Sequence, residues 1–259
     1  MVIEDNCTCR QAFIQISRQD LFARLRDTVE EIKEAFQRDL FFTQEPLMNI
    51  IYENYLATHL LPGTRKIIEL NEVDWNLNGW LPDTYGQYQP DTGRIILNND
   101  QWCRKSLVHE AIHSVSTFDI HDIIRYPSFI EGLTEFFTGF FLFKKFNCCY
   151  DAWKKNLYRY CNISYEPSAK TCYTFSRYVN IEHIMDFYFG NIGMSWDRKW
   201  RNLVANIPQI NNKRFKDPRR GNVGSIIERF HRECIRYFGE DFSNLYYHEA
   251  NHFDYALCI

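Results

Sequence analysis

The stretch from about Thr64 to Asn98 is the part of the chain whose pattern most favours β structure, and helical periodicity surrounds it on both sides. The segment Lys66–Leu70 predicts a strand, and Tyr85–Tyr88 and Arg94–Leu97 flank the turn Pro90–Gly93 as the two arms of a hairpin. We therefore expect an α+β fold that is mostly helical, with a small sheet of about three strands packed on a helix.

Apolar residues at spacings of three and four predict helices before and after this β region. Asp20–Leu40 carries such a stripe, and Pro46–Leu60 repeats the pattern. Gln101–Phe118 and Ser128–Phe146 follow the hairpin, and Pro127 is suited to the first turn of the second of these helices. Further helices are predicted over Asp151–Tyr160, Ala169–Val179, Ile181–Phe189, Trp196–Ile207 and Gly224–Phe238.

These blocks predict a helical N-terminal segment over 1–63, a core over 64–146 that holds the sheet, and a helical C-terminal segment over 147–259 that completes the structure around this core. The hydrophobic share of 45% and the charged share of 24% exclude a disordered chain. We expect the three segments to form one compact unit.

The charges of the chain nearly cancel, since Lys and Arg total 30 and Asp and Glu total 33. This balance favours no nucleic-acid partner, and we interpret the basic run Lys213–Arg220 as a solvated loop. No leader peptide or membrane-spanning segment is predicted. The nine cysteines are an odd number without regular spacing, which favours a reducing compartment, and we expect a cytoplasmic protein without membrane contact.

Two histidines in the segment Leu107–Ser114 carry the chemical prediction. On a helix, His109 and His113 are one turn apart, so both imidazoles project from one face and can bind one metal ion. Glu110 follows the first of them and is placed to hold a metal-bound water. The sequence therefore predicts a metal site with Glu110 as its base.

A catalytic zinc requires a third protein ligand and one open position for water, and two carboxylates compete for the third place. Asp119 lies six residues after His113, but that geometry needs a sharp turn and the non-glycine Ser116 stands where glycine is usual. Glu131 is favoured because seventeen residues separate it from His113, enough for a second helix to run back against the first.

The residues around Glu131 support its burial. Glu135 is one turn further along the same face and can orient a ligand imidazole by accepting its proton. Gly132 removes a side chain where we expect the two helices to approach closely, and the neighbouring residues are mostly apolar.

With these two helices, the stretch from about Lys66 to Phe146, about a third of the chain, resembles the gluzincin class of zinc metallopeptidases. The resemblance implies zinc held by the ligands His109, His113 and Glu131. It implies Glu110 as general base and later proton donor, and Glu135 as the carboxylate that hydrogen-bonds a ligand imidazole and orients it. It also implies that an extended peptide or protein substrate aligns along Arg94–Leu97 as an edge strand.

The residue that would stabilise the oxyanion in such an enzyme is not fixed by a motif here. Tyr173 and Tyr178 are our candidates, since they lie in an aromatic helix that could cover the cleft. A second match to the histidine pattern, His248–His252, is interpreted as a coincidence because no strand precedes it and no Glu follows it, or else as a tail whose histidine reaches the main site.

The sequence thus predicts a zinc-dependent peptidase and leaves two alternatives open. One is a metal-stabilised binding protein that has the site without turnover. The other is a zinc hydrolase that acts on a non-peptide amide, because ligands dictate the chemistry more than the substrate.

Overall fold

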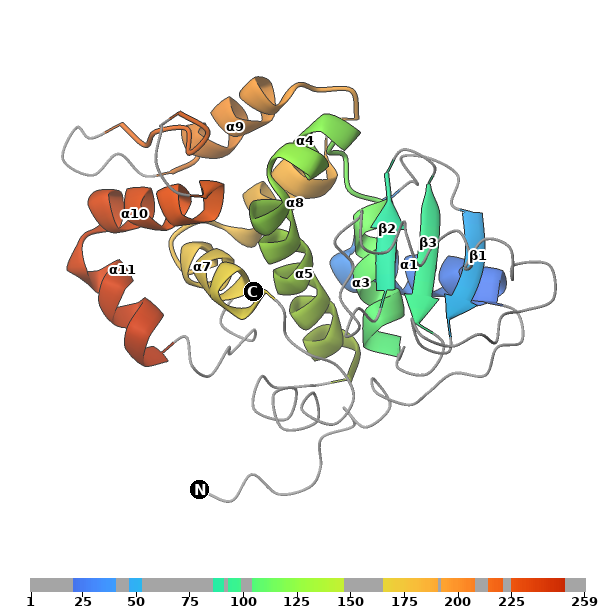
Figure 1. Ribbon diagram of the computed structural model, residues 1–259. Coiled ribbons are helices and arrows are strands. Elements are labelled where there is room, and N and C mark those ends of the chain that lie inside the picture. Colours follow the sequence, from blue (N-terminus) through green and yellow to red (C-terminus); the bar gives the residue numbers. More distant parts are fainter. Residues whose placement is uncertain are drawn as a thin grey trace, which may run out of the picture.

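The computed structural model describes residues 21–40, 47–52, 86–90, 93–98, 104–146, 165–190, 192–207, 214–220 and 225–249 (Figure 1). The described part is mostly helical. Its elements, in chain order, are α1 (Leu21–Phe36), β1 (Leu47–Tyr52), β2 (Gly86–Gln89), β3 (Arg94–Asn98), α3 (Arg104–Ser114), α4 (Ile120–Arg125), α5 (Pro127–Phe146), α7 (Glu166–Ser176), α8 (Ile181–Phe189), α9 (Trp196–Ala205), α10 (Ile226–Phe238), α11 (Glu240–Asn244) and the π-helical turn η2 (Leu245–Glu249).

The three described strands form one sheet in the order β1-β3-β2. Strands β2 and β3 pair antiparallel, with Gly86 opposite Leu97, where the sequence predicts a hairpin. The central strand is β3, since both of its edges are hydrogen-bonded to neighbours, and the expectation that Arg94–Leu97 is an edge strand is therefore wrong. The predicted strand Lys66–Leu70 lies outside the described residues.

The helix predicted over Pro46–Leu60 is wrong for its first part, because Leu47–Tyr52 forms strand β1. This strand runs parallel to β3, with Leu47 opposite Arg94 and a register shift after Met48. A short apolar run fits either a helix or a strand by its periodicity alone, and pairing with β3 decides the outcome. Residues 53–60 lie outside the described part.

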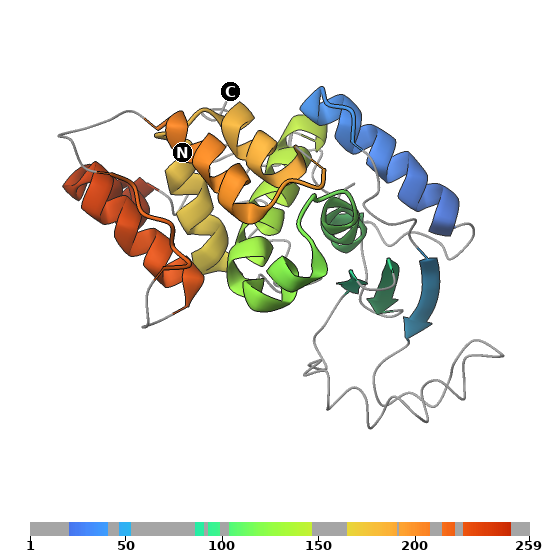
Figure 2. The same cartoon turned by 90° about the horizontal axis from the view of Figure 1, so that it is seen from above.

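Helix α3 lies between two layers, with the sheet on one side and helices α1 and α5 on the other (Figure 2). Every residue from Lys105 to Ser114 is buried, which places the predicted metal helix in the interior. The predicted stripe of α1 is confirmed as a core face, because Leu25, Val29 and Ile32 are at most 2% exposed.

Helix α5 begins at Pro127, as the sequence predicts, and crosses the middle of the molecule (Figure 1). Its closest approach is to α7, since a Cβ built on Gly132 would lie 2.7 Å from the Cβ of Ser168. The expectation that Gly132 makes room for the preceding helix is therefore wrong; the close neighbour is Ser168.

Helices α7, α10 and α11 lie on the side of α5 that faces away from the sheet (Figures 1 and 2), while α8 also packs against the end of α1, where Phe36 contacts Phe189. Aromatic side chains join them, with Trp196 contacting Phe129 of α5 and Phe187 of α8. Helix α8 has the predicted bounds, and α9 and α10 begin within two residues of their predicted starts. None of the described helices combines the length and the hydropathy that crossing a membrane requires.

Candidate metal centre

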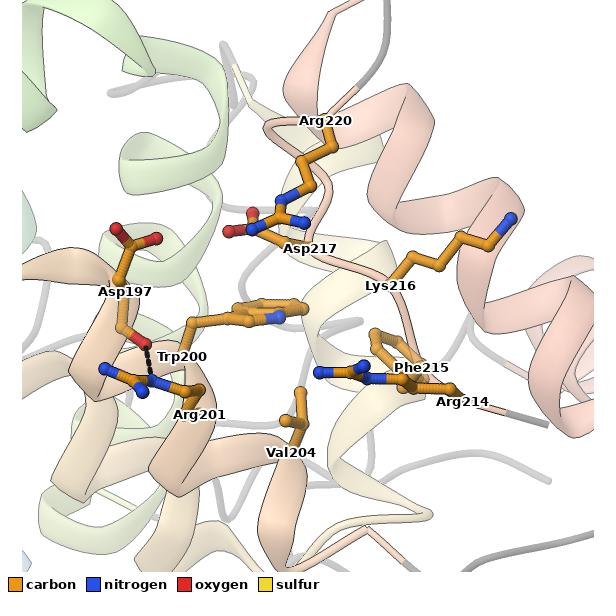
Figure 3. A pocket seen from close by; sticks show the side chains of 9 residues that line it. All are labelled: Asp197, Trp200, Arg201, Val204, Arg214, Phe215, Lys216, Asp217 and Arg220. Atoms are coloured by element: carbon orange, nitrogen blue, oxygen red, sulfur yellow. Dashed lines mark hydrogen bonds between the residues drawn. The ribbon is translucent and has the colours of Figure 1, made fainter. Parts of the chain in front are cut away.

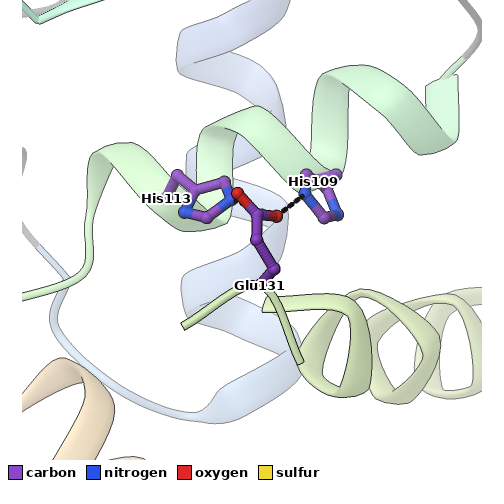
Figure 4. Close-up of side chains that lie close together, drawn as sticks. All are labelled: His109, His113 and Glu131. Atoms are coloured by element: carbon purple, nitrogen blue, oxygen red, sulfur yellow. Dashed lines mark hydrogen bonds and ion pairs between the residues drawn. The ribbon is translucent and has the colours of Figure 1, made fainter. Parts of the chain in front are cut away.

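Helices α3 and α5 bring three potential ligands together (Figure 4). Glu131 extends from α5 between the two imidazoles of α3, and its Oε2 lies 3.1 Å from Nε2 of His109 and 3.1 Å from Nε2 of His113. One ligand atom from each residue lies within 4.8 Å of the others. The two histidines are buried, while the Glu131 side chain is 21% exposed.

These atoms suit one divalent metal ion. Two imidazole nitrogens and a carboxylate oxygen are a common donor set, and ligand atoms around a tetrahedral zinc with bonds of about 2.0–2.1 Å lie roughly 3.3 Å apart. The observed 3.1 Å separations from Glu131 to both histidines are close to that value. The competing carboxylate, Asp119, instead caps α4 by accepting from the backbone N–H of Asp122 at 2.8 Å.

A buried chain of ionic hydrogen bonds stands behind His109. Its Nδ1 lies 2.8 Å from Oε2 of Glu135, and the other carboxylate oxygen accepts from Nζ of Lys105 at 2.7 Å. Burial favours the neutral acid, but the Lys105 charge and the His109 hydrogen bond outweigh it and lower the pKa of Glu135 to about 2. A carboxylate at this position fixes Nδ1 of His109 as the protonated nitrogen, so that Nε2 faces Glu131.

A neutral network supports His113 in the same way. Its Nδ1 lies 3.3 Å from Oγ1 of Thr134, which donates its own proton to the Ile130 carbonyl at 2.9 Å. The lone pairs of this hydroxyl are then free to accept from His113 and from the hydroxyl of Tyr188, which lies 2.5 Å away. Both imidazoles therefore turn Nε2 towards Glu131.

Glu110 lies next to these ligands without joining them. It is 4% exposed, and its carboxylate has no hydrogen-bond partner within the described part of the chain. Burial raises its pKa, and the nearby His109 and His113 offset only part of this effect. A buried carboxylate beside a metal group, with unused lone pairs, is suited to take a proton from a water molecule.

The metal-free protein neutralises the cluster internally. Burial alone would lower the pKa of His109, but its hydrogen bonds to Glu131 and Glu135 outweigh burial and raise it to about 10. Burial alone would raise the pKa of Glu131, but the charge of His113 and the hydrogen bond of His109 hold it below its usual range. A metal ion would take the place of the proton on His109, so metal and protons compete for the site.

The predicted oxyanion residues Tyr173 and Tyr178 lie in α7 and just after its last residue, Ser176. Tyr178 stacks on Phe238 at 4.4 Å, and Tyr173 is buried in α7 with 3% exposure. Tyr165, the residue before α7, lies close enough to the carboxylates that the charge of Glu131 and then burial raise its pKa. Of the second histidine match, His248 is exposed in η2, and His252 lies outside the described residues.

Sequence reasoning missed Lys105, Thr134, Tyr165 and Tyr188. Two of these had a local signal: Lys105 lies one turn before His109, and Thr134 stands between the two glutamates of α5. Tyr165 and Tyr188 reach the centre only through the packing of α7 and α8, which no local spacing indicates.

Comparison of the chain with known protein families, curated proteins and solved structures finds no match. The assignment therefore depends on the geometry alone. That geometry gives a buried group of two histidines and one glutamate that could hold a metal ion.

Proposed function

We propose that this protein is a zinc-dependent metallopeptidase of the gluzincin type. The observation that carries the proposal is the convergence of His109, His113 and Glu131 on one side of a buried helix that also bears Glu110. A bound zinc would lower the pKa of a coordinated water to about 7 and polarise the carbonyl of a substrate.

Residues of the chain itself would transfer the proton and orient the metal ligands. Glu110 accepts the proton of the attacking water and later returns it to the leaving amine, and its raised pKa makes it a stronger base than an exposed glutamate. Glu135 and Thr134 hold the two imidazoles in the orientation that presents Nε2.

Tyr165 is our candidate for stabilising the oxyanion, in place of Tyr173 and Tyr178. Its raised pKa keeps the hydroxyl protonated, so it can donate a hydrogen bond near the ligand group. Tyr165→Phe is expected to lower kcat by about 10²–10³-fold, with zinc content unchanged. Tyr178→Phe serves as the control because its ring packs on Phe238, and equal losses in both variants would remove Tyr165 from the mechanism.

An extended peptide could align along β2, which is an edge of the described sheet and contacts α3. This replaces Arg94–Leu97, whose main-chain groups are occupied on both sides. Tyr88 of β2 supports this placement, because its ring lies parallel to His113 at 6.4 Å.

The decisive experiment compares Glu110→Gln with wild type. We expect the variant to hold one zinc per chain and to lose hydrolysis of every peptide in an unbiased library that the wild type cleaves. The exposed Glu240→Gln should change neither property. Full activity of Glu110→Gln would refute the mechanism.

Two further outcomes separate the alternatives. A zinc-loaded wild type that cleaves no peptide would favour a metal-stabilised binding protein or a hydrolase of other amides. Elemental analysis tests the ligands, since Glu131→Ala should lose zinc while Asp119→Ala should retain it. Retention of zinc by Glu131→Ala would disprove the ligand set.

A further inference from the structure

A cavity of about 670 Å³ lies between α9 and the segment 214–220 (Figure 3). Both of these elements lie on the side of α5 away from the sheet (Figure 1). Its volume falls within the range of roughly 300–1,000 Å³ that is usual for small-molecule sites. We refer to this cavity as the basic pocket. Most of the basic run Lys213–Arg220, which the sequence predicts to be a solvated loop, lines this pocket.

The walls of the basic pocket are held in place by the fold. Phe215 is only 6% exposed and packs against Phe230 of α10, so the segment is anchored in the core. The backbone N–H of Lys216 donates to Glu233, and the Arg236 guanidinium donates to the carbonyl of Arg214 at 2.5 Å. The pocket is therefore shaped before any ligand arrives.

The charges of the basic pocket do not balance. Its two acids, Asp197 and Asp217, both pair with Arg219. The four other charged residues of the lining are cations, and none of them pairs with a carboxylate within the described ranges: Arg201, Arg214, Lys216 and Arg220. A positive pocket on a chain with a net charge of −3 attracts anions locally.

The lining also offers apolar surface. Trp200, Val204 and Phe215 contribute to it, and Figure 3 shows the Arg214 side chain extending from the segment towards Trp200 and Val204. Guanidinium groups bind phosphate through paired donors, and apolar walls favour a flat ring. An inorganic anion such as phosphate would use the guanidinium groups but not the apolar wall.

We propose that the basic pocket binds a nucleoside phosphate or a similar small phosphate ester on a flat ring. The phosphates contact the guanidinium groups of Arg201 and Arg214, and the ring lies against the apolar wall. A pocket confined to α9 and the segment 214–220 fits a small molecule better than a polynucleotide, which needs an extended basic surface.

Calorimetric titration of the full chain with ADP tests this proposal. We expect ADP to bind more tightly than either pyrophosphate or adenosine, because pyrophosphate lacks the ring and adenosine lacks the phosphates. We also expect the double variant Arg201→Gln/Arg214→Gln to weaken ADP binding at least tenfold. Both residues are exposed, so the fold should survive, and circular dichroism checks this.

Arg198→Gln is the matched control, since Arg198 is an exposed arginine of the same helix that does not line the pocket. It should leave ADP affinity unchanged. Glu131→Ala should also leave it unchanged, which separates this site from a nucleotide bound through metal at the candidate centre.

Four results would overturn the proposal. The first three are no ADP binding at millimolar concentration, an equal loss in Arg198→Gln, and loss of binding in Glu131→Ala. Tighter binding of a single-stranded oligonucleotide than of ADP would also overturn it, in favour of nucleic acid.

Discussion

The candidate metal centre and the basic pocket use charge in opposite ways. At the metal centre, Glu135 is 1% exposed and Lys105 is 6% exposed, and the two are paired at 2.7 Å. In the basic pocket, Arg201 and Arg214 are exposed and have no carboxylate partner in the described part of the chain. A charge can be buried only with a partner, whereas water can solvate an exposed one.

This difference indicates how each site would respond to its ligand. Folding alone assembles the candidate metal centre, so a cation would enter a group whose hydrogen-bond partners are already in place. The basic pocket has a fixed wall, and its cations have no carboxylate partner in the described part of the chain. A bound anion would neutralise this excess positive charge. The following variants test the contrast, from the largest expected effect to the smallest.

Lys105→Met should lower the free energy of unfolding by about 3–5 kcal/mol, because it leaves Glu135 charged and buried without its lysine. Lys216→Met, the same change in the basic pocket, should alter it by less than about 0.5 kcal/mol. Chemical denaturation of both variants measures the difference. Similar losses in the two would show that the pairing at Glu135 contributes little.

The effect of Glu135→Gln on the free energy of unfolding should depend on pH, unlike that of a substitution in the basic pocket. The pKa of Glu135 is about 2 in the folded protein and near its ordinary value of 4.5 when unfolded, so its stabilisation is complete above pH 4.5 and is lost as pH falls towards 2. The stability difference from wild type should shrink over that range by as much as about 3 kcal/mol.

The control for this prediction is Arg201→Gln, whose difference from wild type should stay nearly constant between pH 5 and pH 2. Stability at each pH comes from denaturant midpoints of the metal-free protein. A Glu135→Gln difference that does not vary with pH would contradict the ionic assignment.

Gly132→Ala should lower the free energy of unfolding by about 1–3 kcal/mol, because its new Cβ would lie 2.7 Å from that of Ser168. Adding Ser168→Gly should recover part of the loss, since it removes the nearest atom. Thermal and chemical unfolding of the single and double variants measure this. An additive second loss would show that this contact does not limit the approach of α5 and α7.

Arg214→Gln should raise the free energy of unfolding slightly, by up to about 0.5 kcal/mol, by relieving repulsion among the cations of the basic pocket. The gain should disappear in high salt, which screens exposed charges. Denaturation at two salt concentrations tests this. A clear loss of stability would mean that Arg214 has a structural role.

Much of the architecture could be predicted because local patterns there coincide with the final packing. The stripe of α1 and the start of α5 at Pro127 follow from apolar spacing and from the preference of proline for a helical first turn. Strand β1 could not be predicted in this way, because Leu47–Tyr52 fits two periodicities and its partner strand decides between them.

The same division holds at the candidate site. Spacing alone placed His109 and His113 on one helical face and favoured Glu131 over Asp119, because a loop of that length allows a second helix to return. Tyr173 and Tyr178 were chosen from their aromatic segment alone, whereas in the structure it is Tyr165 whose pKa responds to the charge of Glu131, and Tyr178 stacks on Phe238. A helix has several faces, and only its packing shows which one meets the site.

The sequence by itself determined the helical turn that presents two imidazoles and the carboxylate beside them, since these depend on neighbours along one chain segment. The tertiary structure alone decided that Lys105 pairs with Glu135 behind His109 and that Thr134 supports His113. It also decided that Tyr165 lies nearby and that a basic run forms a pocket wall instead of a free loop. The reason is physical: local spacing sets direction on one element, while burial and the pairing of charge arise only between elements.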